Sequence, residues 1–411
     1  MSAGMVIVGA GECGARAAFA LRENGYDGPV TLIGDEPHHP YERPPLSKDV
    51  LTADEPPAPK WVGLPERFAA LKIDCITGMA ALAIDRQAKT VRLAGGSSIS
   101  YEKLLIATGA MPRRLSLAPE ASGRIAYLRS FADAQRLRDH LRPGNHIVVI
   151  GGGFIGLELA ASARKRGAAV TVIEAQPRIL MRGVPEEIAE VVADRHRAED
   201  VRLFCGRGLQ EISEQGRRLL VRLADGEKIE ADCALIGVGA QPVTTLAESA
   251  GLALDNGIAV DATLKTSDPD IHAAGDCCSF PLAIYGGRRV RLESWRNAQD
   301  QGTLAARNML GADEPISAVP WFWSDQHDLT LQVAGLAEGA ANVVRRDLGE
   351  GAFILFHLAA DGRLIAASGI GRGNAVAKDI RLAEMLIAKG ARPLPDQLAT
   401  PDVRLKTLLA A

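Results

Sequence analysis

The sequence predicts an α/β fold of several domains, built around two Rossmann-like βαβ units, and three observations lead to this prediction. A chain of 411 residues exceeds the roughly 250–300 residues that a single hydrophobic core serves. Two glycine-rich turns, residues 9–14 and 151–156, each follow a run of apolar residues. A segment typical of a helix follows each turn, and a second apolar strand follows each helix.

The composition is that of a globular protein and excludes several other classes. Hydrophobic residues make up 47% of the chain and charged residues 24%, which excludes an intrinsically disordered chain. The 47 basic and 50 acidic residues leave a net charge of −3, which argues against charge-driven binding to nucleic acid. We therefore expect no nucleic-acid partner.

Cysteine usage and hydropathy predict a cytoplasmic protein with no membrane partner. The six cysteines are scattered without a CxxC motif, which favours a reducing compartment. The first residues show neither the basic segment nor the cleavage site of a signal peptide, so we expect none. Residues 147–163 are apolar, but they include four glycines and Glu158, so a buried strand and turn explain them better than a membrane span.

The first βαβ unit begins with an expected strand at residues 5–8 and continues with an expected helix at residues 15–24. The turn between them contains Gly9, Gly11, Cys13 and Gly14. A second strand is expected at residues 30–33. An acidic residue, Asp35 or Glu36, follows it.

The second βαβ unit repeats this order, with expected strands at residues 147–150 and 170–173 and an expected helix at residues 157–166. Its turn contains Gly151, Gly153, Ile155 and Gly156. Glu174 directly follows the second strand.

Each residue type in these units has a physical reason. The first glycine allows a tight turn, the second lets the backbone approach a pyrophosphate, and the third lets the helix pack close to the strand. The helix N-terminus offers unpaired N–H groups to the phosphates. A carboxylate after the second strand accepts hydrogen bonds from ribose hydroxyls and repels a 2′-phosphate. Two copies in this order predict two dinucleotide sites.

A rigid turn that presents Lys48 is expected at residues 41–48, whose sequence is Tyr-Glu-Arg-Pro-Pro-Leu-Ser-Lys. From the residues alone, a surface helix start with Ser47 as the N-cap and Lys48 in solvent is the simpler interpretation. Asp276 follows a glycine after an expected strand at residues 271–274. Its carboxylate suits either a polyol hydroxyl or a helix N-cap.

Two further apolar strands, expected in residues 104–109 and 234–239, end in small residues. These small residues include Thr108, Gly109 and Gly239. Small side chains at such positions allow a ligand or a crossing chain to come close.

The order of these motifs resembles the FAD-dependent pyridine nucleotide reductases of the glutathione reductase superfamily. More narrowly, residues 41–48, 293–299 and 321–326 resemble the ferredoxin reductases of bacterial Rieske dioxygenase and cytochrome P450 systems. The resemblance covers essentially the whole chain.

This resemblance implies two Rossmann-like dinucleotide-binding domains plus a C-terminal α/β domain. The FAD domain would comprise residues 1–112 and 242–318, the NAD domain residues 113–241 and the C-terminal domain residues 319–411. Within the last, residues 330–334, 352–356 and 364–367 read as strands and residues 379–388 as a helix.

The resemblance also implies which residues bind the cofactors. For FAD these are Gly9, Gly11, Cys13, Gly14, Asp35, Arg43, Lys48, Ala81, Thr108, Gly109, Arg129, Asp276 and Trp295. For NADH they are Gly151, Gly153, Ile155, Gly156, Glu158, Glu174 and Gly239. Three of them are expected to be catalytic: Lys48 near flavin N5, Trp295 beside the isoalloxazine and Glu158 near the nicotinamide. The resemblance thus favours a catalytic Lys48 over a solvated one.

Several chemistries that related enzymes use are excluded by missing residues. Residues 26–74 contain no cysteine, which excludes a thiol pair that attacks a disulfide. We interpret the adjacent Cys277 and Cys278 as packing residues, because a bond between neighbours would close a strained ring. The eight histidines show no metal-binding spacing and no GxSxG motif is present, so we expect no metal site and no serine nucleophile.

The implied reaction is hydride transfer from NADH to FAD, followed by single-electron transfer to a small acidic [2Fe-2S] ferredoxin. Glu174 favours NADH over NADPH, although the nearby Arg178 and Arg182 would suit a 2′-phosphate. Five arginines against two acids in residues 288–307 predict either a basic docking patch or an ordinary solvated face.

Two alternatives remain. A rubredoxin as the electron acceptor is a close variant. A flavoprotein similar to apoptosis-inducing factor, which signals in its NADH-bound state through dimerisation, is the alternative from another class. That group usually carries a targeting segment and a C-terminal insertion, for which 411 residues leave no room.

Overall fold

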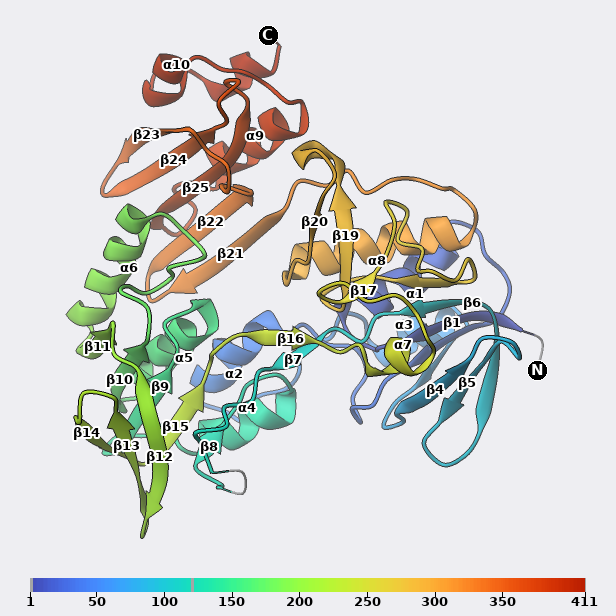
Figure 1. Ribbon diagram of the computed structural model, residues 1–411, viewed down its shortest axis with the longest axis horizontal. Coiled ribbons are helices and arrows are strands. Elements are labelled where there is room, and N and C mark those ends of the chain that lie inside the picture. Colours follow the sequence, from blue (N-terminus) through green and yellow to red (C-terminus); the bar gives the residue numbers. More distant parts are fainter. Residues whose placement is uncertain (1–2, 120–121, 411) are drawn as a thin grey trace. The chain divides into compact units, whose positions relative to one another are not determined.

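The computed structural model describes residues 3–119 and 122–410, which form two compact units, each built from several stretches of the chain (Figure 1). Unit 1 comprises Met1–Glu42, Pro59–Met111 and Gln241–Pro320. Unit 2 comprises Arg43–Ala58, Pro112–Ala240 and Trp321–Ala411. The short strands β7 (Ala110–Pro112) and β16 (Ala240–Pro242) pair where the chain passes from one unit to the other.

Unit 1 is built on a seven-stranded sheet that contains the first βαβ unit. Across the sheet the strands are β3 (Ile73–Ile76), β2 (Val30–Ile33), β1 (Gly4–Val8), β6 (Ser98–Ile106), β5 (Thr90–Leu93) and β4 (Ala81–Asp85), with β18 (Ile271–Ala273) also paired to β6. The strands β3, β2, β1, β6 and β18 are parallel. Their carboxyl ends therefore meet at one edge, where open α/β sheets bind their ligands.

The remaining elements of unit 1 are helices and a small sheet. The helices are α1 (Glu12–Glu23), α3 (Pro65–Ala70), α7 (Thr245–Ser249) and α8 (Trp295–Met309), with a 3₁₀ turn η2 (Ala283–Tyr285). The small sheet contains β17 (Ile258–Ala259), β19 (Cys278–Leu282) and β20 (Arg288–Val290).

Helix α8 lies directly against α1, as Figure 1 shows. A Cβ atom added to Gly302 of α8 would lie 2.4 Å from the carbonyl oxygen of Cys13 in α1, so only glycine permits this approach. Gln299 Nε2 donates a hydrogen bond to Glu12 Oε1 at 2.8 Å. The start of α8 is thereby held beside the glycine-rich turn of the first βαβ unit.

Unit 2 contains the second βαβ unit in a five-stranded parallel sheet. The strands, in order, are β11 (Val201–Cys205), β10 (Ala169–Glu174), β9 (His146–Ile150), β15 (Cys233–Ile236) and β8 (Ile125–Ala126). A separate sheet contains β12 (Leu209–Gln215), β13 (Arg218–Leu223) and β14 (Lys228–Ala231). The helices are η1 (Pro44–Ser47), α2 (Asp49–Thr52), α4 (Phe131–Arg138), α5 (Phe154–Lys165) and α6 (Glu186–Ala198).

The last part of unit 2 is an antiparallel five-stranded sheet with helices. Its strands, in order, are β21 (Trp321–Gln326), β22 (Leu329–Gly335), β25 (Leu364–Arg372), β24 (Ala352–Leu358) and β23 (Asn342–Gly349). It is followed by α9 (Ala377–Ala388), α10 (Pro395–Ala399) and η3 (Leu405–Leu409). The α/β fold that the sequence predicts is confirmed.

The elements differ from the expectations in a few places. Helix α1 begins at Glu12 and α5 at Phe154, so the third glycine of each turn lies within the first helical turn. The strands expected in residues 104–109 and 234–239 end at Ile106 and Ile236, and their small residues lie in the loops beyond. Strands β21 and β23 were not expected. Polar residues interrupt the apolar runs of both, because both are edge strands of their sheet.

The buried Arg346 of β23 fastens the last segment of the chain. Its guanidinium donates hydrogen bonds to the carbonyl oxygens of four later residues: Leu398, Thr400, Pro401 and Val403, at 3.2, 2.8, 2.8 and 2.9 Å. Asp379 of α9 lies 3.4 Å from Arg346 Nε and balances the charge. One side chain that is 3% exposed thus satisfies the backbone of an otherwise irregular segment.

Replacing Arg346 is expected to release this segment. The variant R346M keeps the apolar stem but leaves Asp379 without its ion-pair partner and the four carbonyl oxygens without their donor, which costs about 3 kcal/mol in the free energy of unfolding. Denaturant unfolding and limited proteolysis within residues 398–410 measure the effect. The matched control is R381M, which removes an arginine whose side chain is 58% exposed. An R346M variant as stable and as protease-resistant as R381M would contradict this account.

Candidate functional site

The glycine-rich turn of unit 1 has the shape that a pyrophosphate requires. Gly9 has φ +116°, and a Cβ atom there would lie 2.1 Å from the carbonyl oxygen of Ala107. A Cβ atom on Gly14 would lie 2.0 Å from the carbonyl oxygen of Gly9. Around Gly11, at the N-terminus of α1, no heavy atom lies within 4 Å of an added Cβ atom. Two glycines are therefore fixed by packing, and the third borders open space.

The turn of unit 2 repeats this arrangement. Gly151 has φ +108° and an added Cβ atom would lie 2.4 Å from the carbonyl oxygen of Gly237. A Cβ atom on Gly156 would lie 2.1 Å from the carbonyl oxygen of Gly151, whereas one on Gly153 would meet nothing within 4 Å. Open space in front of unpaired helix N–H groups fits a diphosphate at both turns.

The two turns differ at the position before the third glycine. Cys13 of α1 is 6% exposed and Ile155 of α5 is 49% exposed. Cys13 therefore belongs to the packed core of unit 1. The exposed Ile155 presents a side chain to whatever occupies the second turn.

The acids after the second strands are placed differently. The carboxylate of Glu174, at the end of β10, accepts hydrogen bonds from the N–H groups of Gly152 at 2.7 Å and Gln176 at 2.8 Å. It is thus held at the edge of the second glycine turn. Asp35 lies beyond the end of β2 and is exposed, whereas the neighbouring Glu36 accepts a hydrogen bond from Tyr41 Oη at 2.6 Å.

Other predicted residues of unit 1 lie where strands end. Thr108 Oγ1 donates to the carbonyl oxygen of Val243 at 2.7 Å, and Gly109 has φ +72°. Asp276 follows Gly275, whose N–H donates to Gln301 Oε1 at 2.7 Å. Helix α8 therefore holds the loop that carries Asp276.

Trp295 and Ala81 each begin an element of unit 1. Trp295 is the first residue of α8, after the N-cap Ser294, whose side chain accepts a hydrogen bond from the N–H of Asn297 at 3.2 Å. Ala81 is the first residue of β4. The half-buried Trp295 thus starts the helix that packs on α1.

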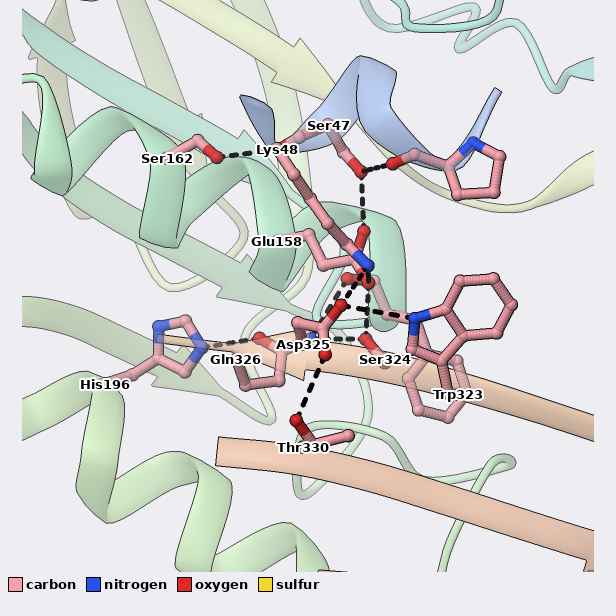
Figure 2. Close-up of polar contacts among 12 residues, drawn as sticks. Ser47, Lys48, Glu158, Ser162, His196, Trp323, Ser324, Asp325, Gln326 and Thr330 are labelled. Carbon is pink, nitrogen blue, oxygen red and sulfur yellow. Dashed lines mark hydrogen bonds and ion pairs between the residues drawn. The ribbon is translucent and has the colours of Figure 1, made fainter. Parts of the chain in front are cut away.

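In unit 2, Lys48 lies between two carboxylates. Lys48 Nζ is 2.6 Å from Asp325 Oδ2 and 3.6 Å from Glu158 Oε1, as Figure 2 shows. It also lies 5.4 Å from the centre of the Trp323 ring, and Trp323 Nε1 donates to Asp325 Oδ2 at 3.2 Å. The alternative of a solvated Lys48 is wrong, because its side chain is 20% exposed and ion-paired. Ser47 does not cap the following helix.

The buried Glu158 accepts hydrogen bonds on both carboxylate oxygens. Ser47 Oγ donates to Oε2 and Ser324 Oγ donates to Oε1, each at 2.6 Å (Figure 2). Burial raises the pKa of the Glu158 carboxyl, and the charge of Lys48 with the two hydroxyl donors opposes that rise. The ion pair and the two serines therefore work against the cost of burying this charge.

The remaining predicted residues of unit 2 support loops. Arg43 Nη1 donates to the carbonyl oxygen of Arg129 at 2.5 Å. Gly239 has φ +104° and its carbonyl oxygen accepts from the N–H of Arg113 at 2.9 Å. The structure brings Lys48 and Glu158 together within unit 2, whereas Trp295 and Asp276 belong to unit 1.

Sequence reasoning assigned no role to Ser324 and Asp325 and considered Ser47 only as an N-cap. Ser324 and Asp325 lie on β21 and contact residues far away in the chain. The only signal was the sequence of residues 321–326, which was part of the family resemblance. Nothing local shows that its serine and aspartate reach a buried acid.

Four of the five arginines of residues 288–307 lie in ion pairs, two of them with acids outside that segment. Arg289 lies 3.5 Å from Asp255, and Arg307 lies 2.7 Å from Glu314. Arg296 pairs with Asp300 at 3.1 Å, and Arg291 pairs with Glu293. The net charge around residues 288–307 is therefore lower than the count of arginines and acids within the segment indicates.

The adjacent cysteines lie in the core of unit 1. Cys277 and Cys278 are free and fully buried, and burial raises the pKa of both thiols; they pack as expected. In the part of the chain that the structure describes, no three His, Cys, Asp or Glu side chains gather as metal ligands would. None of the helices described combines the length and hydropathy of a membrane span.

Comparison with known proteins assigns the chain to a family. The model of the pyridine nucleotide-disulphide oxidoreductases matches residues 4–302, and the model of a reductase C-terminal domain matches residues 321–409. The chain belongs to this family and is an oxidoreductase.

The relatives narrow the group to ferredoxin reductases. The chain is 43% identical over 413 residues to the ferredoxin--NAD(+) reductase component of the anthranilate 1,2-dioxygenase system of Burkholderia cepacia, covering 98% of each chain. It is 35% identical to the putidaredoxin reductase of Pseudomonas putida, covering 99% of this chain and 97% of the other. The predicted resemblance is confirmed.

Solved structures agree with this assignment. The covalent complex of putidaredoxin reductase with putidaredoxin contains a chain that matches with a TM-score of 0.93 and 33% identity, covering 100% of this chain and 98% of the other. A ferredoxin reductase from Rhodopseudomonas palustris matches with a TM-score of 0.93 and 37% identity, covering 99% of each.

Replacing Gly11 or Gly153 by valine should impair one nucleotide site and leave the other intact. G11V and G153V place a side chain in open space with no positive φ to relieve, so both variants are expected to fold. We expect G11V to purify without flavin and G153V to keep flavin but bind NADH at least about tenfold more weakly, a loss of about 1.4 kcal/mol. Flavin content and NADH titration measure this. The control G123V also enters open space, at a glycine outside both turns of the sequence; losses in G123V equal to those in the two variants would refute the assignment.

Proposed function

We propose that this chain is an FAD-dependent NADH:ferredoxin reductase. The observation that carries the proposal is the repeated glycine turn, with open space at Gly11 and at Gly153. We assign FAD to the domain of residues 1–112 and 242–318, NADH to residues 113–241, and residues 319–411 to the C-terminal domain. Family membership and the names of the relatives support the reaction.

The residues of unit 1 fit FAD. Gly9, Gly11 and Gly14 would hold the pyrophosphate at the N-terminus of α1, with Cys13 packed behind them. The remaining contacts of unit 1 are assigned to Asp35, Ala81, Thr108, Gly109, Asp276 and Trp295. The packing of α8 on α1 supports the roles of Asp276 and Trp295, because one helix holds both beside the glycine turn.

The residues of unit 2 fit the nicotinamide cofactor and the reactive ring. Gly151, Gly153, Ile155 and Gly156 would line the pyrophosphate, with Gly239 at the neighbouring strand end. Arg43, Lys48 and Arg129 are also assigned to FAD. The bond from Arg43 to the carbonyl of Arg129 supports their joint placement.

When bound, the flavin converts a two-electron hydride donor into a source of single electrons. Lys48 would stabilise negative charge that develops on the ring, and Asp325 would hold the lysine in place by its ion pair. The carboxylate of Glu158 would accept a hydrogen bond from the nicotinamide amide and so orient the ring. Trp295 would pack beside the isoalloxazine.

NADH is the favoured coenzyme. Glu174 is held by two backbone N–H groups at the edge of the second turn, where its charge would accept ribose hydroxyls and repel a 2′-phosphate. Arg178 donates to the carbonyl oxygens of Ile179 and Val184, each at 3.1 Å, so its guanidinium is engaged by its own loop. This supports NADH more strongly than the sequence alone.

The proposed acceptor is a small acidic [2Fe-2S] ferredoxin of a Rieske oxygenase or cytochrome P450 system. The printed names of the relatives support this class of partner. The six free cysteines support a reducing compartment, the cytoplasm. Because paired acids offset the arginines of residues 288–307, charge steering at this face should be modest.

Removing the Lys48 charge should slow flavin reduction without releasing FAD. We expect K48M to bind a full complement of FAD and to be reduced by NADH at least about tenfold more slowly, equivalent to about 1.4 kcal/mol of transition-state stabilisation. Anaerobic stopped-flow absorbance measures the rate, and NADH-driven reduction of a [2Fe-2S] ferredoxin measures the whole reaction. The control K60M removes a lysine that is 66% exposed. Equal rates in K48M and K60M would remove Lys48 from the catalytic residues.

Changing Glu174 should shift coenzyme preference. E174S removes the negative charge and one pair of acceptor oxygens, so we expect kcat/KM for NADH to fall about tenfold and that for NADPH to rise. Steady-state ferredoxin reduction with both coenzymes measures the ratio. A variant with the ratio of the parent would show that Glu174 does not contact the adenosine ribose.

A further inference from the structure

A continuous chain of hydrogen bonds leads from the buried Glu158 to a pair of histidines. Ser324 Oγ donates to Glu158 Oε1 at 2.6 Å, and Gln326 Nε2 donates to Ser324 Oγ at 2.9 Å. His196 Nε2 lies 3.0 Å from Gln326 Oε1, and His327 Nε2 lies 3.3 Å from His196 Nδ1. Figure 2 shows the chain from Glu158 to His196. The first four of these side chains are buried.

The direction of every bond in this chain is determined. The Gln326 amide group faces two acceptors, Ser324 Oγ and, at 3.5 Å, the carbonyl oxygen of Phe154, so its NH₂ group lies on that side. Gln326 Oε1 then accepts, and His196 must donate from Nε2. A neutral His196 leaves Nδ1 as an acceptor for His327 Nε2–H. All the hydrogens therefore point toward Glu158.

His196 stays neutral at ordinary pH, which the chain requires. It is fully buried, and burial lowers its pKa to about 4. The titratable groups that face it are Arg195 of its own helix, Glu199 at the C-cap of that helix, and His327 from the loop after β21. Arg195 is ion-paired with Glu199 at 2.6 Å, so it does not supply a proton to the ring.

The alternation of side chains along β21 explains how this strand contacts both Glu158 and Lys48. Side chains two residues apart lie on the same face of a strand, so Ser324 and Gln326 share the face toward α5 and α6. Asp325 lies on the other face, where it pairs with Lys48. The charged groups that act on Glu158 are Lys48 and, from the other face of β21, Asp325; the Ser47 and Ser324 hydroxyls donate hydrogen bonds to it.

We propose that Gln326 and His196 are positioning residues that keep the Ser324 hydroxyl hydrogen on Glu158 and so hold the buried carboxylate ionised. This inference rests on the proposed function, in which ionised Glu158 accepts a hydrogen bond from the nicotinamide amide. Without the Gln326 donor, the Ser324 oxygen becomes free to accept and its hydrogen free to turn away. Glu158 then loses a hydrogen-bond donor that stabilises its ionised form, so the pKa of its carboxyl rises.

The variants Q326M and H196F test this in the holoenzyme. Each removes one hydrogen-bonding side chain without adding charge. We expect the acid limb of the pH profile for NADH-dependent flavin reduction to move upward by about half a pH unit or more, a change of about threefold in the ionisation constant of Glu158. S324A, which touches Glu158 directly, should shift the limb at least as far.

A matched control separates this effect from a loss of packing. His357 is likewise buried with a pKa of about 4, and its ring contacts Ser368 at 3.3 Å, outside the chain. We expect H357F to lose stability to a similar degree but to keep the pH profile of the parent. An unchanged profile in Q326M and H196F, with a shift in S324A, would overturn the inference and leave the proposed function intact.

A second measurement does not depend on turnover. Imidazole ¹⁵N NMR of histidine-labelled protein should show His196 as the Nε2–H tautomer in the parent, and Q326M should lose this single state. An Nδ1–H tautomer in the parent would overturn the inference even where a variant fails to fold. By contrast, a parent protein whose flavin NADH does not reduce would refute the proposed function.

Discussion

At two glycine turns the backbone comes so close to itself that only glycine fits, and this close packing shapes both βαβ units. Gly9 and Gly151 sit so near a crossing carbonyl oxygen that a Cβ atom would overlap it, and Gly14 and Gly156 bring each helix against its own turn. The same packing leaves open space before two helix N-termini. Space, unpaired N–H groups and a helix dipole together define a site for a diphosphate.

The charged and polar groups around Glu158 come from several segments of the chain. Lys48 comes from the turn after residue 43, Glu158 from α5, and Ser324 with Asp325 from the edge strand β21. A buried carboxylate is costly unless it is paired and hydrogen-bonded. Here one lysine and two serines meet that need, which explains why a C-terminal domain belongs in the same unit as the second turn.

The βαβ units were predictable because their determinants are local: strand, glycine spacing, helix and acid follow one another along the chain. The predicted strands agree with β1, β2, β9 and β10 to within one residue at each end. Lys48 was not predictable in this way. Local rules favour a solvated lysine after Pro-Pro-Leu-Ser, whereas its ion-pair partners Glu158 and Asp325 lie far away in the chain, Asp325 by 277 residues. The roles of Ser324 and Gln326 could not be predicted either. In the sequence they are ordinary polar residues of a strand, and their roles come from contacts with α5 and α6.

In the function that we propose, a single flavin, without thiols or metals, carries all the electrons that pass through this chain. Anaerobic titration of the purified holoprotein with NADH, followed by absorbance, tests it most directly. We predict that one equivalent of NADH per bound flavin completes the reduction, and that each reduced flavin then reduces two equivalents of a [2Fe-2S] ferredoxin. Uptake of a second equivalent of NADH would reveal another redox centre, and protein that stays colourless after mixing with FAD would contradict the account altogether.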